Sequence, residues 1–339
     1  MIRHANRLGN PMLTSTICRR EHWDLPWFAP WAAFFSNPPA GIDVGPWRVK
    51  YHRKIWEWVA ISQALDERGL LRPGARGCGF AVGREPLTSL FARRGVDILA
   101  TDLAADDASA AGWSRTLQHA DNMEALHWPS IVDRDDFDNH VAFLAQDMRA
   151  LEPKRLGSFD FIWSSCSFEH LGDLEAGIAF VLRSTELLKV GGIAVHTTEF
   201  NLSSSEKTIS SGDDVIYRLK DIEEIANRLR LLGCALHVFD QNAGHAIEDI
   251  EYDYPQYYEN NREHIKLELS GFIATSCLLI ITKGRYPDAQ PPISELVEKL
   301  AVAAPKPTLL EIIRGSKYWY LTWPIRVRWQ ALRRWMRKL

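Results

Sequence analysis

The sequence predicts an α/β fold built on a mostly parallel β-sheet, and three observations lead to this prediction. Strand-like apolar runs alternate with helix-like stretches from residue 75 onward. Such alternation favours a parallel sheet with helices on both faces. The last two strand-like runs change this rhythm, because a short run and a long linker precede the final apolar run at 271–283. We therefore expect the last strand to be antiparallel, at an edge of the sheet.

The predicted elements follow one another along the chain. The apolar positions of 52–71 repeat at helical spacing, and the "RPG" that follows ends this helix. The strand-like runs are 76–82, 96–102, 140–147, 159–166, 192–200, 235–240 and 271–283. Helix-like stretches between them are 85–95, 173–189 and 221–232. We therefore expect a seven-stranded sheet.

The domain organisation follows from composition. Residues 1–49 are rich in Pro, Trp and Phe and lack periodicity, which indicates an irregular N-terminal cap. Residues 50–284 form the α/β domain, and the Pro-rich stretch 285–308 is a linker. It leads to 309–339, where Trp and Arg alternate at helical spacing beyond Pro324. These boundaries predict one large domain with an extension at each end.

Composition and charge exclude several classes of protein. The 339 residues are 46% hydrophobic with a net charge of −3, so a full core is expected and a nucleic-acid binder is not. The five cysteines are scattered, which favours a reduced, cytoplasmic protein. The N-terminus is too polar for a secretory signal, and no apolar run approaches the ~20 residues that span a bilayer.

The C-terminal segment carries the strongest charge bias. Residues 314–339 hold eight Lys or Arg residues and no acid, together with four of the thirteen tryptophans. A helix with Trp on one face and Arg on the other suits a membrane surface with anionic lipid. Packing on the body of the protein or on a partner remains open. We expect peripheral membrane association or docking to a partner protein.

A loop of small residues follows the first strand of the alternation. In "GCGFAVGREP" (77–86), Gly79, Ala81 and Gly83 are the small positions, and Asp102 ends the next strand. A tight turn of this kind lets backbone approach a nucleotide, and an acidic side chain after the second strand grips a ribose. The match to GxGxxG is poor, and Glu85 stands where a pyrophosphate needs a bare helix N-terminus. NAD-dependent oxidoreduction is therefore disfavoured, whereas a cationic nucleoside without phosphate fits.

Over roughly residues 50–284 the order of elements resembles that of class I S-adenosylmethionine-dependent methyltransferases. "GFAVG" looks like the first motif, "ATDLA" the second and "AQDMRAL" the acidic loop after the third strand. "FDFIWSSCSFEHL" and "LLKVGGIAVHTTEF" resemble the fourth strand with its loop and the passage into the fifth strand. The chain departs from the family pattern at Gly77, where an acid is common, and at Ala81, where glycine is usual.

The resemblance implies S-adenosylmethionine as cofactor and assigns residues to it. Gly79, Ala81 and Gly83 approach the methionine part, and Asp102 holds the ribose. Asp147 with Met148 borders the adenine, and Leu103 and Ser165 complete the expected cofactor contacts. "GFAVGREPL", "EHLGDLEAG", "AVHTTEFN" and the tail further resemble methyltransferases of bacterial surface-polysaccharide biosynthesis.

If the acceptor is a hydroxyl, a general base is required within hydrogen-bond reach. The candidates, in order, are His170, Glu199, His196 and His264. His170 follows the fourth strand, whereas strand alternation puts His196 and Glu199 on opposite faces of the fifth. A buried structural role for His196 is about as well supported as catalysis, and helix capping competes for the Glu169–His170 pair.

No metal site is predicted, because the His and acidic residues lack a diagnostic spacing. Trp163 and Trp113 are candidates for stacking on the donor, with core packing the favoured alternative for Trp163. Trp23, Trp27, Phe28 and Trp31 form either a sugar-stacking wall or a cover for the sheet edge.

The sequence thus predicts a methyltransferase that O-methylates a sugar hydroxyl of a cell-envelope polysaccharide or its precursor. It would act in the cytoplasm or at the inner face of the membrane, with a sugar or glycan acceptor and a membrane or glycosyltransferase partner at its C-terminal helix. Methylation of another small molecule, a lipid or an amine is a rival. A catalytically degenerate methyltransferase fold that serves as a docking module is a second rival.

Overall fold

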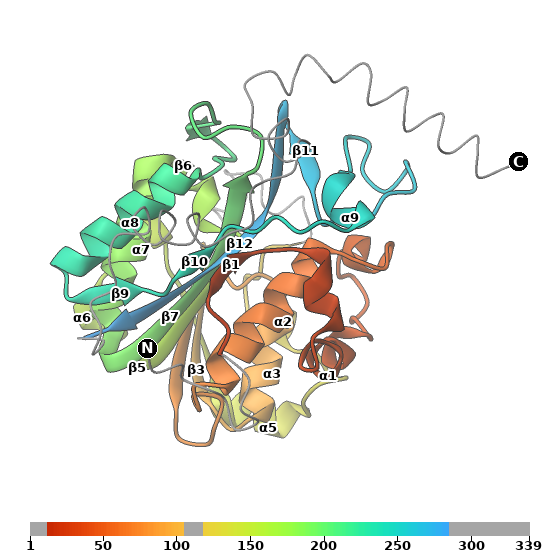
Figure 1. The fold of residues 1–339 in the computed structure, drawn as a ribbon. Helices are drawn as coiled ribbons and strands as arrows, with labels where there is room; N and C mark the ends of the chain where they lie inside the picture. The colour runs from red at the N-terminus through yellow and green to blue at the C-terminus, as the bar shows by residue number, and fades with distance from the viewer. Residues whose placement is uncertain (1–11, 105–117, 285–339) are drawn as a thin grey trace, which may run out of the picture. The chain divides into compact units, whose positions relative to one another are not determined.

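A computed structural model describes residues 12–104 and 118–284. The predicted linker 285–308, the C-terminal helix 309–339 and Trp113 lie outside these residues. Figure 1 shows one mixed sheet with helices against both of its faces. Among the described residues, no helix is long and apolar enough to cross a membrane.

The sheet has ten strands in the described residues, and its main path runs β10-β1-β12-β7-β5-β2-β3-β4. The central strands are β2 (Arg76–Phe80), β3 (Asp97–Asp102), β4 (Val141–Ala145), β5 (Phe159–Ser165) and β7 (Leu188–Asn201). These five pair in parallel, and β12 (Phe272–Lys283) runs antiparallel to β7. The predicted α/β class, the mostly parallel sheet and the antiparallel last strand are confirmed. The expected edge position of the last strand is wrong, because β1 pairs with β12 on the side away from β7.

The sheet has more strands than the seven expected. The predicted strand 235–240 is two short strands, β9 (Cys234–Leu236) beside β12 and β10 (Phe239–Asp240) beside β1. The N-terminal segment supplies β1 (Ser15–Ile17), which pairs with both β12 and β10. Further short strands are β11 (Leu267–Leu269) on β12 and the separate pair β6 (Gly172–Asp173) and β8 (Ser211–Gly212). The expected count was low because these strands are too short to carry an alternating pattern.

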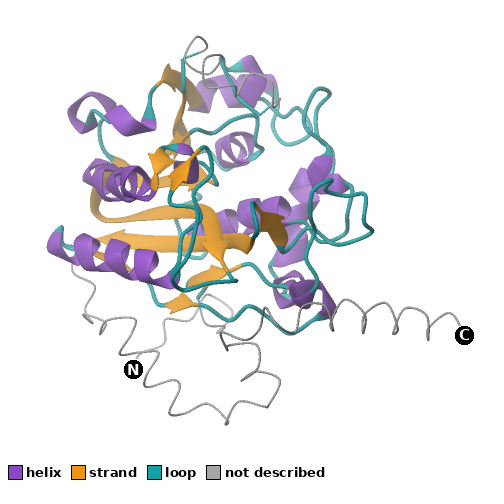
Figure 2. Ribbon diagram, turned by 90° about the horizontal axis from the view of Figure 1, so that it is seen from above, coloured by secondary structure: helices purple, strands orange, loops and turns teal. Residues whose placement is uncertain are grey.

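Helices cover the two faces of the sheet (Figures 1 and 2). On one side lie α1 (Phe28–Ala32), α2 (Arg53–Asp66), α3 (Leu87–Arg93) and α5 (Arg134–His140), and on the other α6 (Pro153–Leu156), α7 (Leu174–Ser184) and α8 (Leu219–Leu231). A one-turn helix, α9 (Ile247–Ile250), follows β10.

The strand alternation explains how both faces are filled. Phe161 and Trp163 of β5 point into the core beneath α3, where Phe91 meets Trp163 edge-on at 5.1 Å between ring centroids. Phe80 of β2 points the other way and packs edge-on against Phe180 of α7. Trp163 is therefore a core residue, the alternative that its place in a strand favoured.

Candidate functional site

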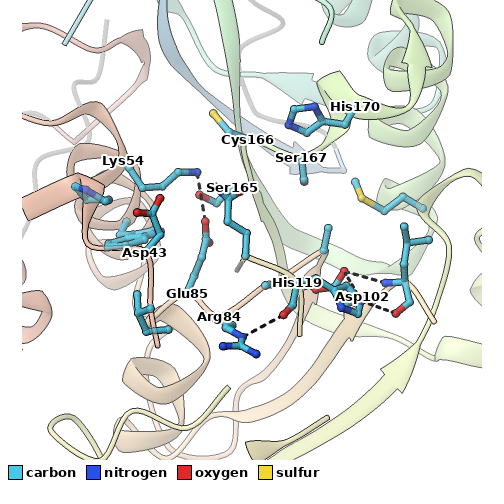
Figure 3. A pocket seen from close by; sticks show the side chains of 18 of the residues that line it. Asp43, Lys54, Arg84, Glu85, Asp102, His119, Ser165, Cys166, Ser167 and His170 are labelled. Atoms are coloured by element: carbon cyan, nitrogen blue, oxygen red, sulfur yellow. Dashed lines mark hydrogen bonds and ion pairs between the residues drawn. The ribbon is translucent and has the colours of Figure 1, made fainter. Parts of the chain in front are cut away.

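A cavity of about 320 Å³ opens where the central strands end (Figure 3). One side is formed by the residues that follow the carboxyl ends of β2, β3, β4 and β5. The other side is formed by the N-terminal segment, the start of α2 and the loop before β11. The parallel strands thus place their end residues on one cleft, as open α/β sheets do. Seven of the eight predicted cofactor residues line this cavity, and Gly79 does not. The seven are Ala81, Gly83, Asp102, Leu103, Asp147, Met148 and Ser165.

The loop after β2 is held in a tight conformation. Gly83 has φ of +54°, and a Cβ there would lie 2.5 Å from the carbonyl oxygen of Gln118. Ala81 also has a positive φ, 45°, which costs a residue with a Cβ about 1–2 kcal/mol. Gly79 lies beneath this loop, where a Cβ would meet Trp163 at 2.4 Å. The small residues are thus needed for backbone conformation and close packing.

The same geometry explains the departure at Gly77. A Cβ on Gly77 would lie 2.5 Å from the ring of Phe161. An acidic side chain does not fit at this point in β2 unless the core beneath α3 changes.

Asp102 joins the loop to the end of β3. Its Oδ2 accepts hydrogen bonds from the backbone N–H of Gly83 (3.0 Å) and Ala120 (3.2 Å), and its Oδ1 accepts one from Leu103 (2.8 Å). Burial raises the pKa of Asp102, against the lowering effect of these donors. Two carboxylate oxygens offer about four lone-pair sites, so Asp102 retains capacity for a ligand hydroxyl.

The turn after β4 forms the next wall of the cavity. Asp147 caps the short 3₁₀ turn Met148–Ala150 and accepts a hydrogen bond from the Arg149 backbone at 2.8 Å. Partial burial raises the pKa of Asp147, but the hydrogen bonds of the Arg149 guanidinium outweigh it and hold the pKa below its usual value. Met148 is buried beside it. This is an apolar surface next to an ionised acid, which suits an aromatic base with an amino group.

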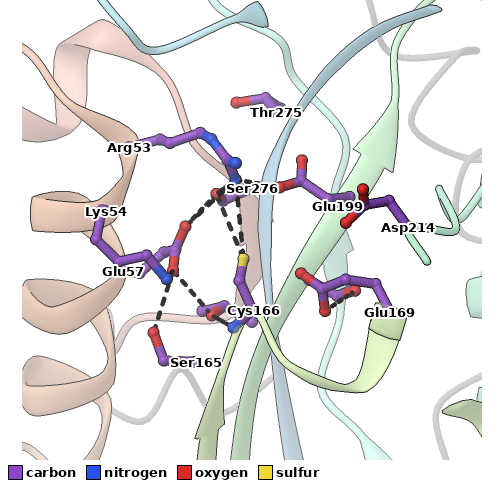
Figure 4. A network of polar contacts seen from close by, with 12 residues as sticks. Arg53, Lys54, Glu57, Ser165, Cys166, Glu169, Glu199, Asp214, Thr275 and Ser276 are labelled. Atoms are coloured by element: carbon purple, nitrogen blue, oxygen red, sulfur yellow. Dashed lines mark hydrogen bonds and ion pairs between the residues drawn. The ribbon is translucent and has the colours of Figure 1, made fainter. Parts of the chain in front are cut away.

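An ion pair joins α2 to the residue after the loop. Lys54 Nζ lies 3.3 Å from Glu85 Oε1 and 2.8 Å from Glu57 Oε2 (Figures 3 and 4). Burial raises the pKa of Glu85 to about 7, against the pull of Lys54. Glu85 Oε2 and Ser167 Oγ are buried and make no hydrogen bond within the described residues, although both side chains line the cavity. Unpaired buried polar atoms around one cavity are typical of a ligand site.

A buried charge network lies behind this pair (Figure 4). Glu57, which is fully buried, accepts hydrogen bonds from Ser276 and Ser165, and Arg53 forms an ion pair with Glu199. Although burial raises the pKa of Glu57, Lys54 and Arg53 outweigh it and lower the pKa to about 2. The network therefore fixes the start of α2 on the sheet and directs Lys54 toward the cavity.

His264 lines the opposite wall and belongs to a hydrogen-bonded dyad. Its Nδ1 lies 2.6 Å from Oδ2 of the buried Asp253, and its ring stacks on His52 at 4.5 Å. Burial lowers the pKa of His264, so the ring is neutral at pH 7. With Nδ1–H donated to Asp253, Nε2 is left as the proton acceptor, and it makes no hydrogen bond within the described residues.

His52 and Tyr258 extend this wall. His52 Nδ1 accepts the Lys54 backbone N–H at 3.0 Å, so its Nε2–H donates to Tyr258 Oη, also at 3.0 Å. The ring centroid of Tyr258 lies 4.9 Å from that of His264. Three flat rings thus form one side of the cavity.

His170, the first candidate for the base, lines the cavity in a different electrostatic setting. Its Nδ1 donates to the carbonyl of Asp213 (2.8 Å) and to Asp214 Oδ1 (2.9 Å). Burial lowers the pKa of His170, but Asp214 and Glu169 outweigh it and raise the pKa to about 9. His170 is therefore a cation at neutral pH and suits hydrogen-bond donation better than proton removal.

The structure does not bring His196 or Glu199 to the cavity. His196 is fully buried on the face of β7 that α7 covers. There its Nδ1 lies 2.8 Å from Ser164 Oγ and its ring packs against Phe180. Burial lowers the pKa of His196 to about 3. Glu199 is buried in its ion pair with Arg53. A base at either position would have to act through other residues, which corrects the expectation of direct catalysis.

Sequence reasoning missed Lys54, His52, Tyr258 and Asp253. They come from a helix start and a long loop, and no motif joins them to the glycine-rich loop. Lys54 and Glu57 are three residues apart on α2, and this spacing was the one local signal available.

Comparisons with known proteins complete the description. No known family profile matches this chain, and neither does any curated protein. Among solved structures, it is similar to magnesium protoporphyrin IX methyltransferase from Synechocystis, crystallised with bound SAH, at 14% identity over 78% of this chain and 98% of that one, with a TM-score of 0.41. It is also similar to an S-adenosylmethionine-dependent methyltransferase from Clostridium acetobutylicum (14% identity, 71% of this chain, 96% of that chain, TM-score 0.38). A third is a TehB-like SAM-dependent methyltransferase from Corynebacterium glutamicum (17% identity, 64% of this chain, 84% of that chain, TM-score 0.33). At these identities, function has to be argued from the residues of the site itself.

Proposed function

We propose that this protein transfers a methyl group from S-adenosylmethionine to a hydroxyl oxygen of a sugar. The observation that carries this proposal is the arrangement of the cavity. On one side lies the loop of small residues after β2, which is hydrogen-bonded to Asp102. On the other side lies the neutral His264, whose Nε2 makes no hydrogen bond within the described residues. Methyl transfer to a hydroxyl needs one surface that binds the nucleoside donor and, within reach of it, a base that removes the hydroxyl proton.

The residues present fit the donor. Asp102 would hold the ribose, the Asp147–Met148 turn would border the adenine, and the loop 79–83 would approach the amino-acid end. Glu85 Oε2, buried and unpaired within the described residues, offers an acceptor for an ammonium group, and Lys54 offers a cation for a carboxylate. S-adenosylmethionine supplies an electrophilic methyl group on a sulfonium.

The protein's own part in the reaction is to orient the acceptor and remove its proton. Nε2 of His264 accepts the proton of the hydroxyl as that oxygen forms its bond to the methyl carbon. The carbon–sulfur bond breaks, and its electron pair stays on sulfur. Asp253 then stabilises the imidazolium through the bond to Nδ1. His170, as a cation, adds positive charge to the same cavity.

The sugar is favoured by the wall around the base. The stacked His52, His264 and Tyr258 rings offer a flat surface for the C–H face of a sugar ring. Asp43, which is exposed and also lines the cavity, offers a carboxylate for neighbouring hydroxyls. A cell-envelope polysaccharide or its precursor is the acceptor that the sequence resemblance favours.

The test begins with calorimetric titration of the full chain with S-adenosylmethionine and S-adenosylhomocysteine. We expect micromolar binding of both, and absence of binding would favour the docking-module alternative. Transfer of radiolabelled methyl is then assayed on sugar nucleotides, lipid-linked sugars, amines and fatty acids. Label in an acid-stable methyl ether of a sugar supports the proposal, whereas label on an amine or a lipid refutes the sugar assignment.

We also propose that the segment 309–339 holds the protein at the cytoplasmic face of an anionic membrane. Its four-tryptophan, arginine-rich sequence supports this. Flotation with vesicles containing anionic phosphatidylglycerol should recover the full chain, and Trp329→Ser with Trp335→Ser should reduce recovery. Equal recovery of wild type and variant would refute docking through these tryptophans, whereas no recovery of the full chain would refute membrane docking and favour a protein partner.

A further inference from the structure

We infer that Cys166, Glu169 and Glu199 form a binding site for a zinc ion behind the wall of the cavity. One ligand atom from each residue, the Cys166 Sγ and a carboxylate oxygen of each glutamate, lies within 4.8 Å of the other two. Figure 4 shows the three side chains converging from the end of β5, the turn after it and β7. This site lies outside the donor contacts proposed above and does not depend on methyl transfer.

The chemistry of these atoms points to zinc. Zn²⁺ accepts thiolate sulfur and carboxylate oxygen, and a thiolate ligand disfavours Mg²⁺, Ca²⁺ and Mn²⁺. Zinc sites with three protein ligands keep a further position open for water or substrate. Because Cys166 also lines the cavity, this position is within reach of a ligand from the cavity.

A second, independent observation supports a cation here. Glu199 is only 5% exposed, yet its Oε2 is buried without a hydrogen bond from any described residue. Its other oxygen pairs with Arg53, and Glu169 accepts a hydrogen bond from Thr198 Oγ1 at 3.0 Å. Buried carboxylate oxygens are normally satisfied, so an unpaired one in a ligand cluster is a place where an ion would bind.

Arg53 is compatible with the ion. Its Nη1 lies 3.9 Å from Cys166 Sγ and pairs with the oxygen of Glu199 that the ion would not need. Hydrogen bonds to ligand atoms of this kind are usual around metal sites. Zinc binding would convert the Cys166 thiol to a thiolate and release its proton to solvent, so affinity should rise with pH.

The experiment titrates the tag-free, chelator-treated full chain with Co²⁺ and with Zn²⁺, without donor or acceptor. We expect one Zn²⁺ per chain by calorimetry and a thiolate-to-cobalt charge-transfer absorption band. Cys166→Ser should abolish the band and weaken Zn²⁺ binding at least about tenfold. Glu169→Gln and Glu199→Gln, which keep side-chain shape, should weaken it as well.

Cys234→Ser is the matched control, because this cysteine lies on β9 outside the cluster, and it should behave as wild type. Thermal midpoints and circular dichroism show which variants are folded. Absence of one-to-one binding in the wild type would overturn the inference, as would an unchanged cobalt band in a folded Cys166→Ser variant or an unchanged Zn²⁺ affinity in a folded Glu169→Gln variant. Neither result bears on donor binding, so failure here is distinguishable from failure of the proposed function.

Discussion

Asp253 and His264 form a hydrogen bond of 2.6 Å between Oδ2 and Nδ1 at the wall of the cavity. Asp253 is fully buried and is itself held by the Asn260 amide (2.6 Å) and the backbone N–H of Tyr254 (2.9 Å). The carboxylate therefore cannot turn away, and the tautomer of His264 is set by its position. This relationship supplies the base that the proposed reaction requires.

His264→Asn should lower kcat at least about 100-fold while the affinity for S-adenosylmethionine stays within about twofold, because it removes the proton acceptor and not a donor contact. Steady-state kinetics and calorimetry give the two values. In the wild type, kcat should fall with decreasing pH, with a midpoint below the ordinary histidine pKa of 6.5, because burial lowers the pKa of His264. His170→Asn serves as comparison: if it alone abolishes turnover and His264→Asn does not, the assignment of the base is wrong.

Asp102→Asn should weaken binding of S-adenosylmethionine at least about tenfold and lower the free energy of unfolding by about 2 kcal/mol. The change removes the charge that three backbone N–H groups share, and hydrogen bonds to charged groups contribute about 1.5–3 kcal/mol each. Calorimetry and urea unfolding measure the two effects. Glu224→Gln, an exposed change on α8, is the control. Unaltered donor affinity in a folded Asp102→Asn protein would contradict the ribose assignment.

Two changes in the loop after β2 should act in opposite directions. Gly83→Ala should destabilise the fold and weaken donor binding, because a Cβ there lies 2.5 Å from the Gln118 carbonyl, which accepts a hydrogen bond from Arg84. Ala81→Gly should stabilise the fold by up to about 1 kcal/mol, because it relieves a positive φ. Thermal and urea unfolding of both variants would show whether the signs differ, and a loss of stability in Ala81→Gly would contradict the strain.

The pKa of Glu85 gives a prediction about stability and pH. Burial raises it from 4.5 to about 7, so the folded protein keeps a proton that the unfolded chain has lost in this range. The stabilisation from this group is fully present below about pH 4.5 and is lost as the pH rises through 7. Glu85→Gln cannot ionise, so its free energy of unfolding should decline less than that of the wild type between pH 4.5 and 7. Parallel curves from urea unfolding across this range would show that Glu85 does not carry the proton.

The α/β class, the succession of the central strands along the chain and the antiparallel last strand were predictable because they rest on local patterns. The run that became β3 and the loop that holds Gly83 lie close together in the chain, and each has its own composition signal. Asp102 followed from the rule that parallel strands end at one edge, and the Asp147–Met148 turn followed from the resemblance to class I methyltransferases. These parts of the candidate site needed no knowledge of distant contacts.

The tertiary structure alone decided the wall of the cavity that faces the strand ends. β1 joins the sheet beside β12, His52 stacks on His264, and Arg53 reaches Glu199 only because distant segments of the chain pack together. Neither short strands nor single side chains in long loops leave a periodic pattern in the sequence. Burial and pairing then separated the histidines. His196 is buried within the sheet, Asp214 favours the protonated form of His170, and Asp253 orients His264. The sequence by itself determined which strand ends line one wall of the cavity, and packing between distant segments determined which residues face them.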